Sequence, residues 1–213
     1  MGEAAKKKQA KKQQGAPNTA ATILEYMEMF VFAVAFVILL LTFALRLCEV
    51  DGPSMNNTLS EGERLLISDL FYTPKQNDII VFHLTDSPNP HYNKPIVKRV
   101  IATGGQHVKI NFAEKKLYVS DDAVFSEDEL IDESGYAYFS GGIWNQPRVT
   151  PKHATQSGDE YEFHVPEGKL FVMGDNRNNS ADSRSDDIGF VDEECVLGRA
   201  LLCVMPFSSF RTL

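Results

Sequence analysis

The feature that most constrains this chain is an uninterrupted apolar run near its N-terminal end. Residues 29–45 read MFVFAVAFVILLLTFAL, without a charge, Pro or Gly, and lie between Glu28 and Arg46. A helix that crosses a bilayer needs about 20 apolar residues, within a range of about 17–25. Tyr26 and Met27 extend the run, so the sequence predicts a membrane-spanning helix over residues 26–46.

Two alternatives to an anchor are a cleaved signal peptide and a buried core helix. A signal peptide has a shorter apolar region, about 7–15 residues, followed by small residues at a cleavage site. The residues that follow here are Arg46-Leu47-Cys48-Glu49, which contain no small-x-small pattern. A core helix would carry polar residues on one face, and residues 29–45 have no such face, because Thr42 is their only polar residue. Both alternatives are therefore disfavoured.

Charge divides the chain at the same place. Residues 1–46 hold six basic and three acidic residues, a net charge of +3, whereas residues 47–213 hold 15 basic and 26 acidic residues, a net charge of -11. Five lysines in residues 6–12 favour a cytoplasmic N-terminus. The sequence thus predicts a single-pass cell-membrane protein with a basic cytoplasmic tail over residues 1–25 and an extracytoplasmic body over residues 47–213. Such an acidic body disfavours nucleic acid as a partner.

The body predicts β structure, because short β-branched and aromatic runs recur between turn residues. No long segment has an amphipathic helical period, so we predict a mostly β, barrel-like or sandwich-like domain, with a short helical turn near residues 55–60 or 126–131. The predicted strands are residues 64–67, 78–82, 96–101, 107–110, 116–119, 160–165, 170–173 and 195–202.

An acidic stretch over residues 121–133 contains seven acidic residues and no basic one. A solvated surface loop is the favoured interpretation, and a cation or partner site is the alternative. The aromatic residues that follow the stretch are interpreted as core or rim packing, with contact to lipid headgroups as the alternative; they are Tyr136, Tyr138, Phe139 and Trp144.

Cysteine and histidine point to no cofactor and no metal. Cys48, Cys195 and Cys203 are odd in number and have no CxxC spacing, so they predict neither a disulfide framework nor a zinc site. Cys195 and Cys203 are either a pair in an oxidising compartment or small buried apolar residues. Cys48 is a weak candidate for palmitoylation. The five histidines form no HExxH motif, and His83, His91 and Asp86 are only a weak metal candidate.

Two segments stand out as carriers of chemistry. Residues 51–59 read DGPSMNNTL soon after the apolar run, and residues 174–184 read GDNRNNSADSR directly after an apolar strand. The second holds two Arg and two Asp, which would allow ion pairs that fix the shape of a loop. No GxSxG motif is present, and spacing alone does not test a Ser-His-Asp triad.

Lys98 lies within an apolar strand, PIVKRVI. In an alternating strand Lys98 points the same way as Ile96 and Val100, so the face that carries it is apolar. Burial disfavours the charged amine and lowers its pKa, which would let it act as a base. A strand-end lysine that reaches solvent, or lies beside the membrane, is the alternative.

Taken in order, these segments resemble bacterial type I signal peptidases. The apolar anchor is followed by Gly-x-Ser-Met-x-x-Thr-Leu, then Lys-Arg-Val-Ile, then Gly-Asp-Asn-Arg-x-x-Ser-x-Asp-Ser-Arg, and a single N-terminal anchor resembles the Gram-positive form. The resemblance covers residues 24–213. It implies an antiparallel β-sheet catalytic domain with a smaller β subdomain near residues 106–166. It also implies a Ser-Lys serine endopeptidase that removes signal peptides from exported preproteins, next to the bilayer and the secretion machinery.

The motifs carry the family's roles to particular residues. Ser54 corresponds to the nucleophile, Lys98 to the general base and Ser180 to the hydroxyl that orients the lysine. Met55 is interpreted as packing and pocket wall. Gly52 stands where some relatives have an oxyanion-hole Ser, so backbone N–H groups would have to form the hole. The residues that match those shaping the site are Asp175, Arg177, Asp182 and Arg184.

The sequence departs from the family pattern at two further places. Asn57 stands where a Pro is usual, and Ala102-Thr103-Gly104-Gly105-Gln106 replaces a Leu-Pro-Gly-Asp turn. Neither change removes a catalytic side chain. Two other functions compete: an inactive membrane-anchored assembly relative, disfavoured because Ser54 and Lys98 are both present, and a self-cleaving repressor, disfavoured because an anchor replaces the DNA-binding domain.

Overall fold

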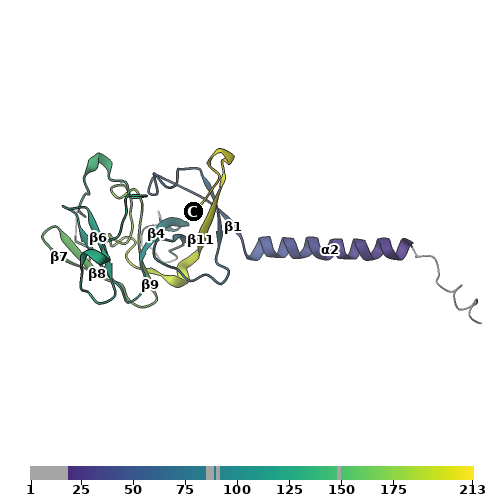
Figure 1. Cartoon of the computed structure of the whole chain (residues 1–213), viewed down its shortest axis with the longest axis horizontal. Coiled ribbons are helices and arrows are strands. Elements are labelled where there is room, and N and C mark those ends of the chain that lie inside the picture. The colour runs from purple at the N-terminus through teal and green to yellow at the C-terminus, as the bar shows by residue number, and fades with distance from the viewer. Residues whose placement is uncertain (1–18, 85–88, 90–91, 148–149) are drawn as a thin grey trace, which may run out of the picture. The chain divides into compact units, whose positions relative to one another are not determined.

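The computed structural model describes residues 19–84, 89, 92–147 and 150–213. Most of the predicted basic tail, together with Asp86 and His91 of the weak metal candidate, lies outside the described residues. The chain divides after Phe43 into two compact units, and each is described by itself (Figure 1).

The first unit contains the apolar helix α2, Thr19–Phe43. It holds no Pro or Gly, and residues 19–39 form a span with a mean hydropathy of 2.0 whose side chains are not buried in the protein. Its length and composition suit a membrane span. The helix ends three residues before Arg46, the end predicted from the sequence, because Arg46 begins the first strand.

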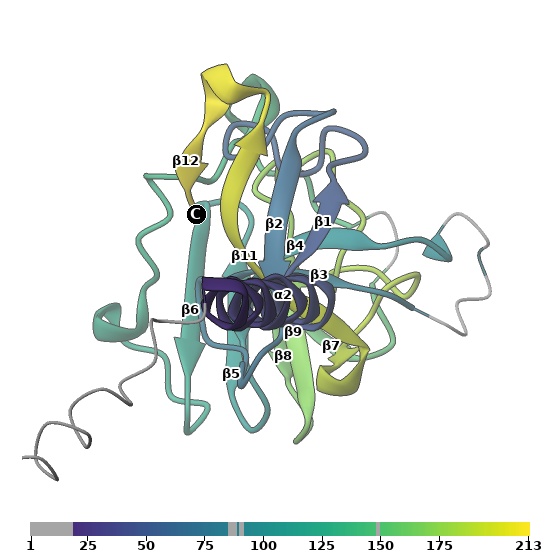
Figure 2. The ribbon, with the colours of Figure 1, turned by 90° about the vertical axis from the view of Figure 1, so that its right-hand side faces the viewer.

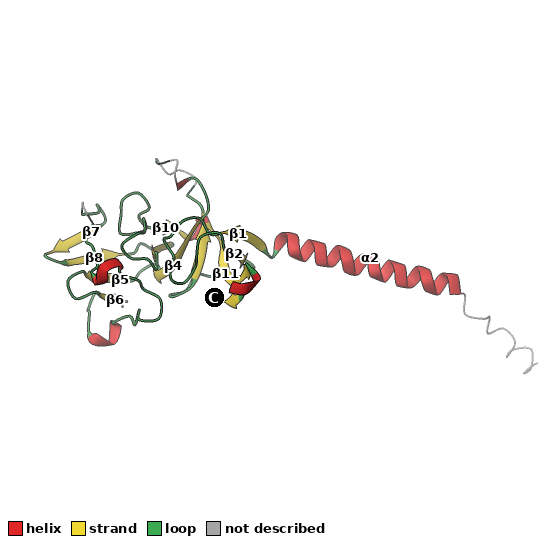
Figure 3. Cartoon of the chain, turned by 90° about the horizontal axis from the view of Figure 1, so that it is seen from above, coloured by secondary structure: helices red, strands yellow, loops and turns green. Residues whose placement is uncertain are grey.

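The second unit is built from two antiparallel sheets, which confirms the mostly β fold class (Figure 3). The larger sheet has the strand order β1-β2-β11-β3-β4-β9-β10, and β12 pairs with β11. Its strands are β1 (Arg46–Glu49), β2 (Arg64–Ser68), β3 (Ile79–Phe82), β4 (Ile96–Ala102), β9 (Lys169–Met173), β10 (Val191–Asp192), β11 (Val196–Met205) and β12 (Arg211–Thr212).

The smaller sheet has the order β6-β5-β8-β7. It lies at the end of this unit that is opposite to β1 and β11 (Figures 1 and 2). Its strands are β5 (His107–Asn111), β6 (Lys116–Ser120), β7 (Ala154–Ser157) and β8 (Glu160–His164). They fall within the range predicted for a smaller subdomain, residues 106–166. The 3₁₀ turns of the unit are η2 (Glu127–Glu129), η3 (Ser140–Gly142), η4 (Glu193–Cys195) and η5 (Phe207–Ser209).

Strand β4 contributes to all three hydrophobic clusters of the unit. Val97 packs with Met55 and Leu59, Val100 packs with residues of β3 and β9, and Ile101 belongs to the cluster that joins the two sheets. Both faces of β4 are therefore covered, and its side chains are held by tightly packed neighbours.

Two of the open interpretations are resolved here. Within the described residues, Cys48, Cys195 and Cys203 form no disulfide, and burial raises the pKa of Cys203. Trp144 is buried against Phe112 and Phe139, as the core interpretation predicts.

The unusual turn after β4 is held by its own residues. The side chain of Gln106 accepts a hydrogen bond from the Thr103 N–H at 2.9 Å. A Cβ on Gly104 would lie 2.9 Å from Cα of Glu167, so only glycine lets the two backbone segments approach this closely. Close packing and the Gln106 hydrogen bond thus fix this turn where the family pattern has a proline.

Candidate active site

Ser54 lies in a tight turn between β1 and β2. Backbone hydrogen bonds join Val50 to the segment before β2, from the Val50 N–H to the Glu63 carbonyl at 2.8 Å and from the Gly62 N–H to the Val50 carbonyl at 2.9 Å. Met55 and Leu59 are buried and anchor the turn from within. Gly52 has φ +84°, a conformation that favours glycine, and a Cβ there would meet nothing within 4 Å.

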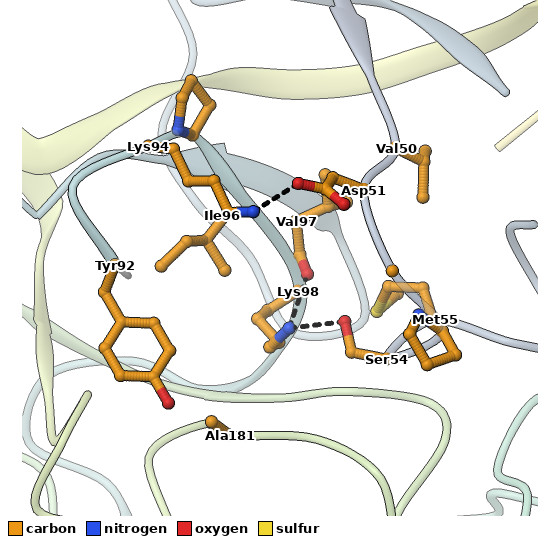
Figure 4. Close-up of a pocket in the computed structure, with 13 residues that line it drawn as sticks. Val50, Asp51, Ser54, Met55, Tyr92, Lys94, Ile96, Val97, Lys98 and Ala181 are labelled. Atoms are coloured by element: carbon orange, nitrogen blue, oxygen red, sulfur yellow. Dashed lines mark hydrogen bonds and ion pairs between the residues drawn. The ribbon is translucent and has the colours of Figure 1, made fainter. Parts of the chain in front are cut away.

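Lys98 reaches the Ser54 hydroxyl from β4, a strand that is not adjacent in the sheet to β1 or β2. Its Nζ lies 2.7 Å from Oγ of Ser54 and 3.1 Å from the carbonyl oxygen of Val97 (Figure 4). Lys98 is only 3 % exposed. Burial, the largest effect, lowers the pKa of Lys98 to about 8, with nearby Asp182 opposing the shift and Arg184 adding to it. With this pKa, a fraction of the Lys98 amine is neutral near pH 7 and can accept a proton.

A pocket of about 300 Å³ opens above this pair. One wall is the segment from Val50 to Met55, and the other is the segment from Lys94 to Lys98, with Tyr92 and Ala181 at the side (Figure 4). Met55 is both a packing residue and part of the pocket lining, as predicted. A pocket of this volume, lined in part by apolar residues such as Pro53, Met55 and Ile96, suits small side chains.

Asn176, in the loop after β9, holds the Ser54 turn through two hydrogen bonds. Its backbone N–H donates to the Ser54 carbonyl at 3.0 Å, and its side-chain amide donates to the Pro53 carbonyl at 3.0 Å. The Ser54 N–H makes no hydrogen bond within the part of the chain that the structure describes. A Cβ on Gly174 would lie 2.5 Å from the Ser54 carbonyl oxygen, so this loop approaches the turn as closely as glycine allows.

Asp175 binds Arg99, the residue next to Lys98, through two parallel hydrogen bonds. Arg99 Nε lies 2.8 Å from Oδ1 and Nη2 lies 2.7 Å from Oδ2, and the Thr58 hydroxyl also donates to Oδ2. This pair ties β4, the Ser54 turn and the loop after β9 together. Sequence reasoning missed Arg99 as a site residue, although its charge in a strand buried on both faces was a usable signal.

Asp182 and Arg184 form the second bidentate pair, with distances of 2.8 Å and 2.7 Å. Asp182 also accepts the Gly174 N–H at 3.0 Å. Burial raises the pKa of Asp182, but Arg184 and the Gly174 N–H outweigh it, so the pKa is held below its usual value. The predicted ion pairs in this loop are therefore confirmed for Asp182 and Arg184, whereas Asp175 takes its partner from β4.

Arg177 takes its partner from the acidic stretch. It is 2 % exposed and forms an ion pair with Glu133, which is 8 % exposed. The guanidinium also faces the rings of Tyr136 and Trp144, at 5.7 Å and 5.3 Å from their centroids. The interpretation of residues 121–133 as a solvated loop is therefore wrong at Glu133, because this carboxylate neutralises a buried arginine of the site.

Ser180 lies over Gly174, where a Cβ on the glycine would come within 2.6 Å of its own Cβ. Its hydroxyl donates to the Ala181 carbonyl at 3.5 Å. Among the described residues, Lys98 is held by Ser54 and Val97 and makes no hydrogen bond with Ser180. The orienting role that the resemblance assigns to Ser180 stays a prediction.

No three His, Cys, Asp or Glu side chains in the described ranges lie close enough together to hold a metal ion. The geometry here is that of a nucleophile beside a buried amine.

Comparison with known proteins decides the family. The family model described as "Signal peptidase, peptidase S26" matches residues 23–205. The chain belongs to the S26 family of signal peptidases. The resemblance found in the sequence is thus confirmed, and the chain is a hydrolase of the signal-peptidase type.

Relatives in this family cover most of the chain. Signal peptidase I of Bacillus licheniformis is 31 % identical over 197 residues, which span 91 % of this chain and 95 % of that protein. Signal peptidase IB of Staphylococcus aureus is 30 % identical over 84 % of this chain and 88 % of its own length. The crystal structure of a signal peptidase I from Enterococcus faecalis V583 is 30 % identical, covers 60 % of this chain and 97 % of that one, and has a TM-score of 0.38.

Proposed function

We propose that this chain is a membrane-anchored serine endopeptidase that removes N-terminal signal peptides from exported preproteins with a Ser54–Lys98 dyad. The single observation that carries the proposal is the 2.7 Å distance between Oγ of Ser54 and Nζ of a lysine that is almost completely buried. A hydroxyl becomes a useful nucleophile when a base stands within hydrogen-bond reach, and a buried lysine can be that base.

The chemistry follows from this geometry. Neutral Lys98 takes the hydroxyl proton as Ser54 Oγ bonds to the scissile carbonyl carbon, and the free Ser54 N–H donates to the oxyanion. When the C–N bond breaks, the protonated amine of Lys98 gives its proton to the leaving nitrogen and an ester remains on Ser54. Lys98 then takes a proton from a water molecule as the water oxygen attacks the ester carbonyl carbon. When the ester C–O bond breaks, Lys98 returns this proton to Ser54 Oγ, which releases the acid and restores the serine hydroxyl and the neutral amine.

The substrate is proposed to lie as an extended strand in the pocket. Residues Ile96–Lys98 pair with β3 on one side, whereas β9 pairs with β4 only from Arg99 onward. The other edge of Ile96–Lys98 therefore has no partner strand among the described strands, which suits strand addition by a peptide. The small pocket beside Ser54 fits the small side chains that the family resemblance implies at the first and third positions before the cut.

We infer that α2 anchors the enzyme and that the basic tail keeps the N-terminus cytoplasmic. Residues 47–213 would then be the extracytoplasmic peptidase domain of a single-pass cell-membrane protein. Ser54 follows Arg46 by eight residues, a reach of at most about 26–29 Å. Cleavage would take place close to the bilayer, where signal peptides emerge from the secretion machinery.

A preprotein cleavage assay tests this function. The full chain in detergent micelles is expected to cut a model preprotein once, directly after a small-x-small sequence, with the cut mapped by mass spectrometry. A chelator is expected to leave the rate unchanged, because the proposed chemistry uses only side chains and backbone groups. Cutting at unrelated sites, or inactivation by the chelator, would contradict the proposal.

The rate is expected to rise with pH through the pKa of Lys98. With a pKa of about 8, roughly a tenth of the amine is neutral at pH 7 and about nine tenths at pH 9. The kcat/KM for a model peptide should therefore increase nearly tenfold between these pH values and then level off. A rate that stays flat or falls over this range would exclude Lys98 as the general base.

A further inference from the structure

A hydrogen bond and an ion pair cross the active-site pocket between its two walls. The inner one joins Ser54 to Lys98. The outer one is an ion pair between the carboxylate of Asp51 and the ammonium of Lys94, which are three and four residues before Ser54 and Lys98 (Figure 4). The inner lysine is buried, whereas the side chains of Asp51 and Lys94 are 60 % and 44 % exposed. The outer pair therefore lies at the rim of the pocket.

The proposed substrate path runs between the same two walls. A peptide on the free edge of Ile96–Lys98 has the segment from Lys94 to Lys98 on one side and the segment from Val50 to Ser54 on the other. Successive side chains of an extended peptide point in opposite directions. If the first and third side chains before the cut enter the pocket, the second and fourth point outward, toward the rim.

We propose that Asp51 and Lys94 determine substrate specificity. They do so by electrostatic interaction with the outward-facing substrate side chains at the second and fourth positions before the cut. This inference rests on the proposed function. The paired charges cancel, so the intact pair accepts substrates of either sign. A charged substrate side chain exchanges with the like-charged member of the pair, at small cost because exposed ion pairs contribute little.

The test uses three peptides that differ only at these two positions, which are both Gln, both Glu or both Lys. The wild-type enzyme is expected to give a ratio of kcat/KM for the Glu and Lys peptides within about twofold of one. Asp51→Asn leaves Lys94 alone and should favour the Glu peptide by about fivefold at low salt, and Lys94→Gln should favour the Lys peptide to a similar extent. The double variant should return the ratio to that of the wild type.

Two matched variants control for net charge. Glu61→Gln and Lys75→Gln make the same charge changes at exposed positions that do not line the pocket, and they should leave the ratio unchanged. The shifts in the Asp51 and Lys94 variants should fade at about 0.5 M salt, because exposed charges are screened.

Single variants that keep the wild-type ratio would overturn this inference and leave the proposed function standing. If the wild-type enzyme cut none of the three peptides, the proposed function would fail and the inference with it.

Discussion

Ser54→Ala and Lys98→Met are each expected to lower the rate of preprotein cleavage by at least about 10⁴-fold. Members of a catalytic unit act together, so the loss of either one removes nearly all of the covalent pathway. Ala removes the attacking oxygen, and Met keeps the volume of the lysine stem but carries no base. Single-turnover cleavage of a model preprotein, with the cut mapped, measures the effect.

Stability separates loss of chemistry from loss of fold. Lys98→Met replaces a buried amine with an apolar side chain of similar size, so thermal unfolding should occur at the wild-type temperature or higher. The matched controls are Ser60→Ala and Lys75→Met, which alter exposed side chains away from the pocket and should keep the wild-type rate. Near-normal cleavage by Ser54→Ala or Lys98→Met would refute the dyad.

Glu133→Gln is expected to destabilise the peptidase unit by about 3–5 kcal/mol, because it leaves the buried guanidinium of Arg177 without its counter-charge. Trp144 is the single tryptophan of the chain, is buried, and faces the guanidinium of Arg177. Its fluorescence during urea unfolding of the full chain in micelles therefore measures the stability of this region. The double variant Glu133→Gln/Arg177→Met should recover part of the loss, since it removes the orphaned charge.

Glu127→Gln is the matched control for this prediction. Glu127 belongs to the same acidic stretch, but its ion pair with Lys116 is exposed to solvent. Such pairs contribute about 0–1 kcal/mol, so this variant should unfold at nearly the wild-type urea concentration. Equal effects at positions 127 and 133 would mean that burial of the Glu133–Arg177 pair has no energetic consequence.

The strands with a strong local signal were predictable from the sequence. Arg64–Ser68, Ile79–Phe82 and Ile96–Ala102 are rich in β-branched and aliphatic residues and lie between turn signals, and the structure has strands there. Strand β1 was missed because Arg46–Glu49 is short and gains its stability only by pairing with β2. Strand β7 consists of small and polar residues. Whether such a segment forms a strand depends on its pairing with a neighbouring strand, which a local sequence pattern does not contain.

The residues of the candidate site that belong to a sequence motif could be predicted. The residues that reach the site only through tertiary packing could not. Ser54 and Lys98 were found from their motifs, and the apolar face around Lys98 followed from alternation. Glu133 was missed because an acidic run has the same composition on a solvated loop as beside a buried arginine. The two readings differ only in a contact between residues 44 positions apart, which no local pattern contains.

Within the strands that the structure describes, the free edge of β4 is short, and its length has a consequence for self-association. Pro95 has no N–H to offer before Ile96, and β9 occupies the edge from Arg99 onward. Long unpaired edges are templates on which copies of a chain pair into aggregates, and edge prolines limit that pairing. Three residues are enough to register a short peptide segment, yet too few to start a sheet shared between two copies. We therefore expect this edge to accept a short substrate peptide and not to pair with a neighbouring copy of the chain.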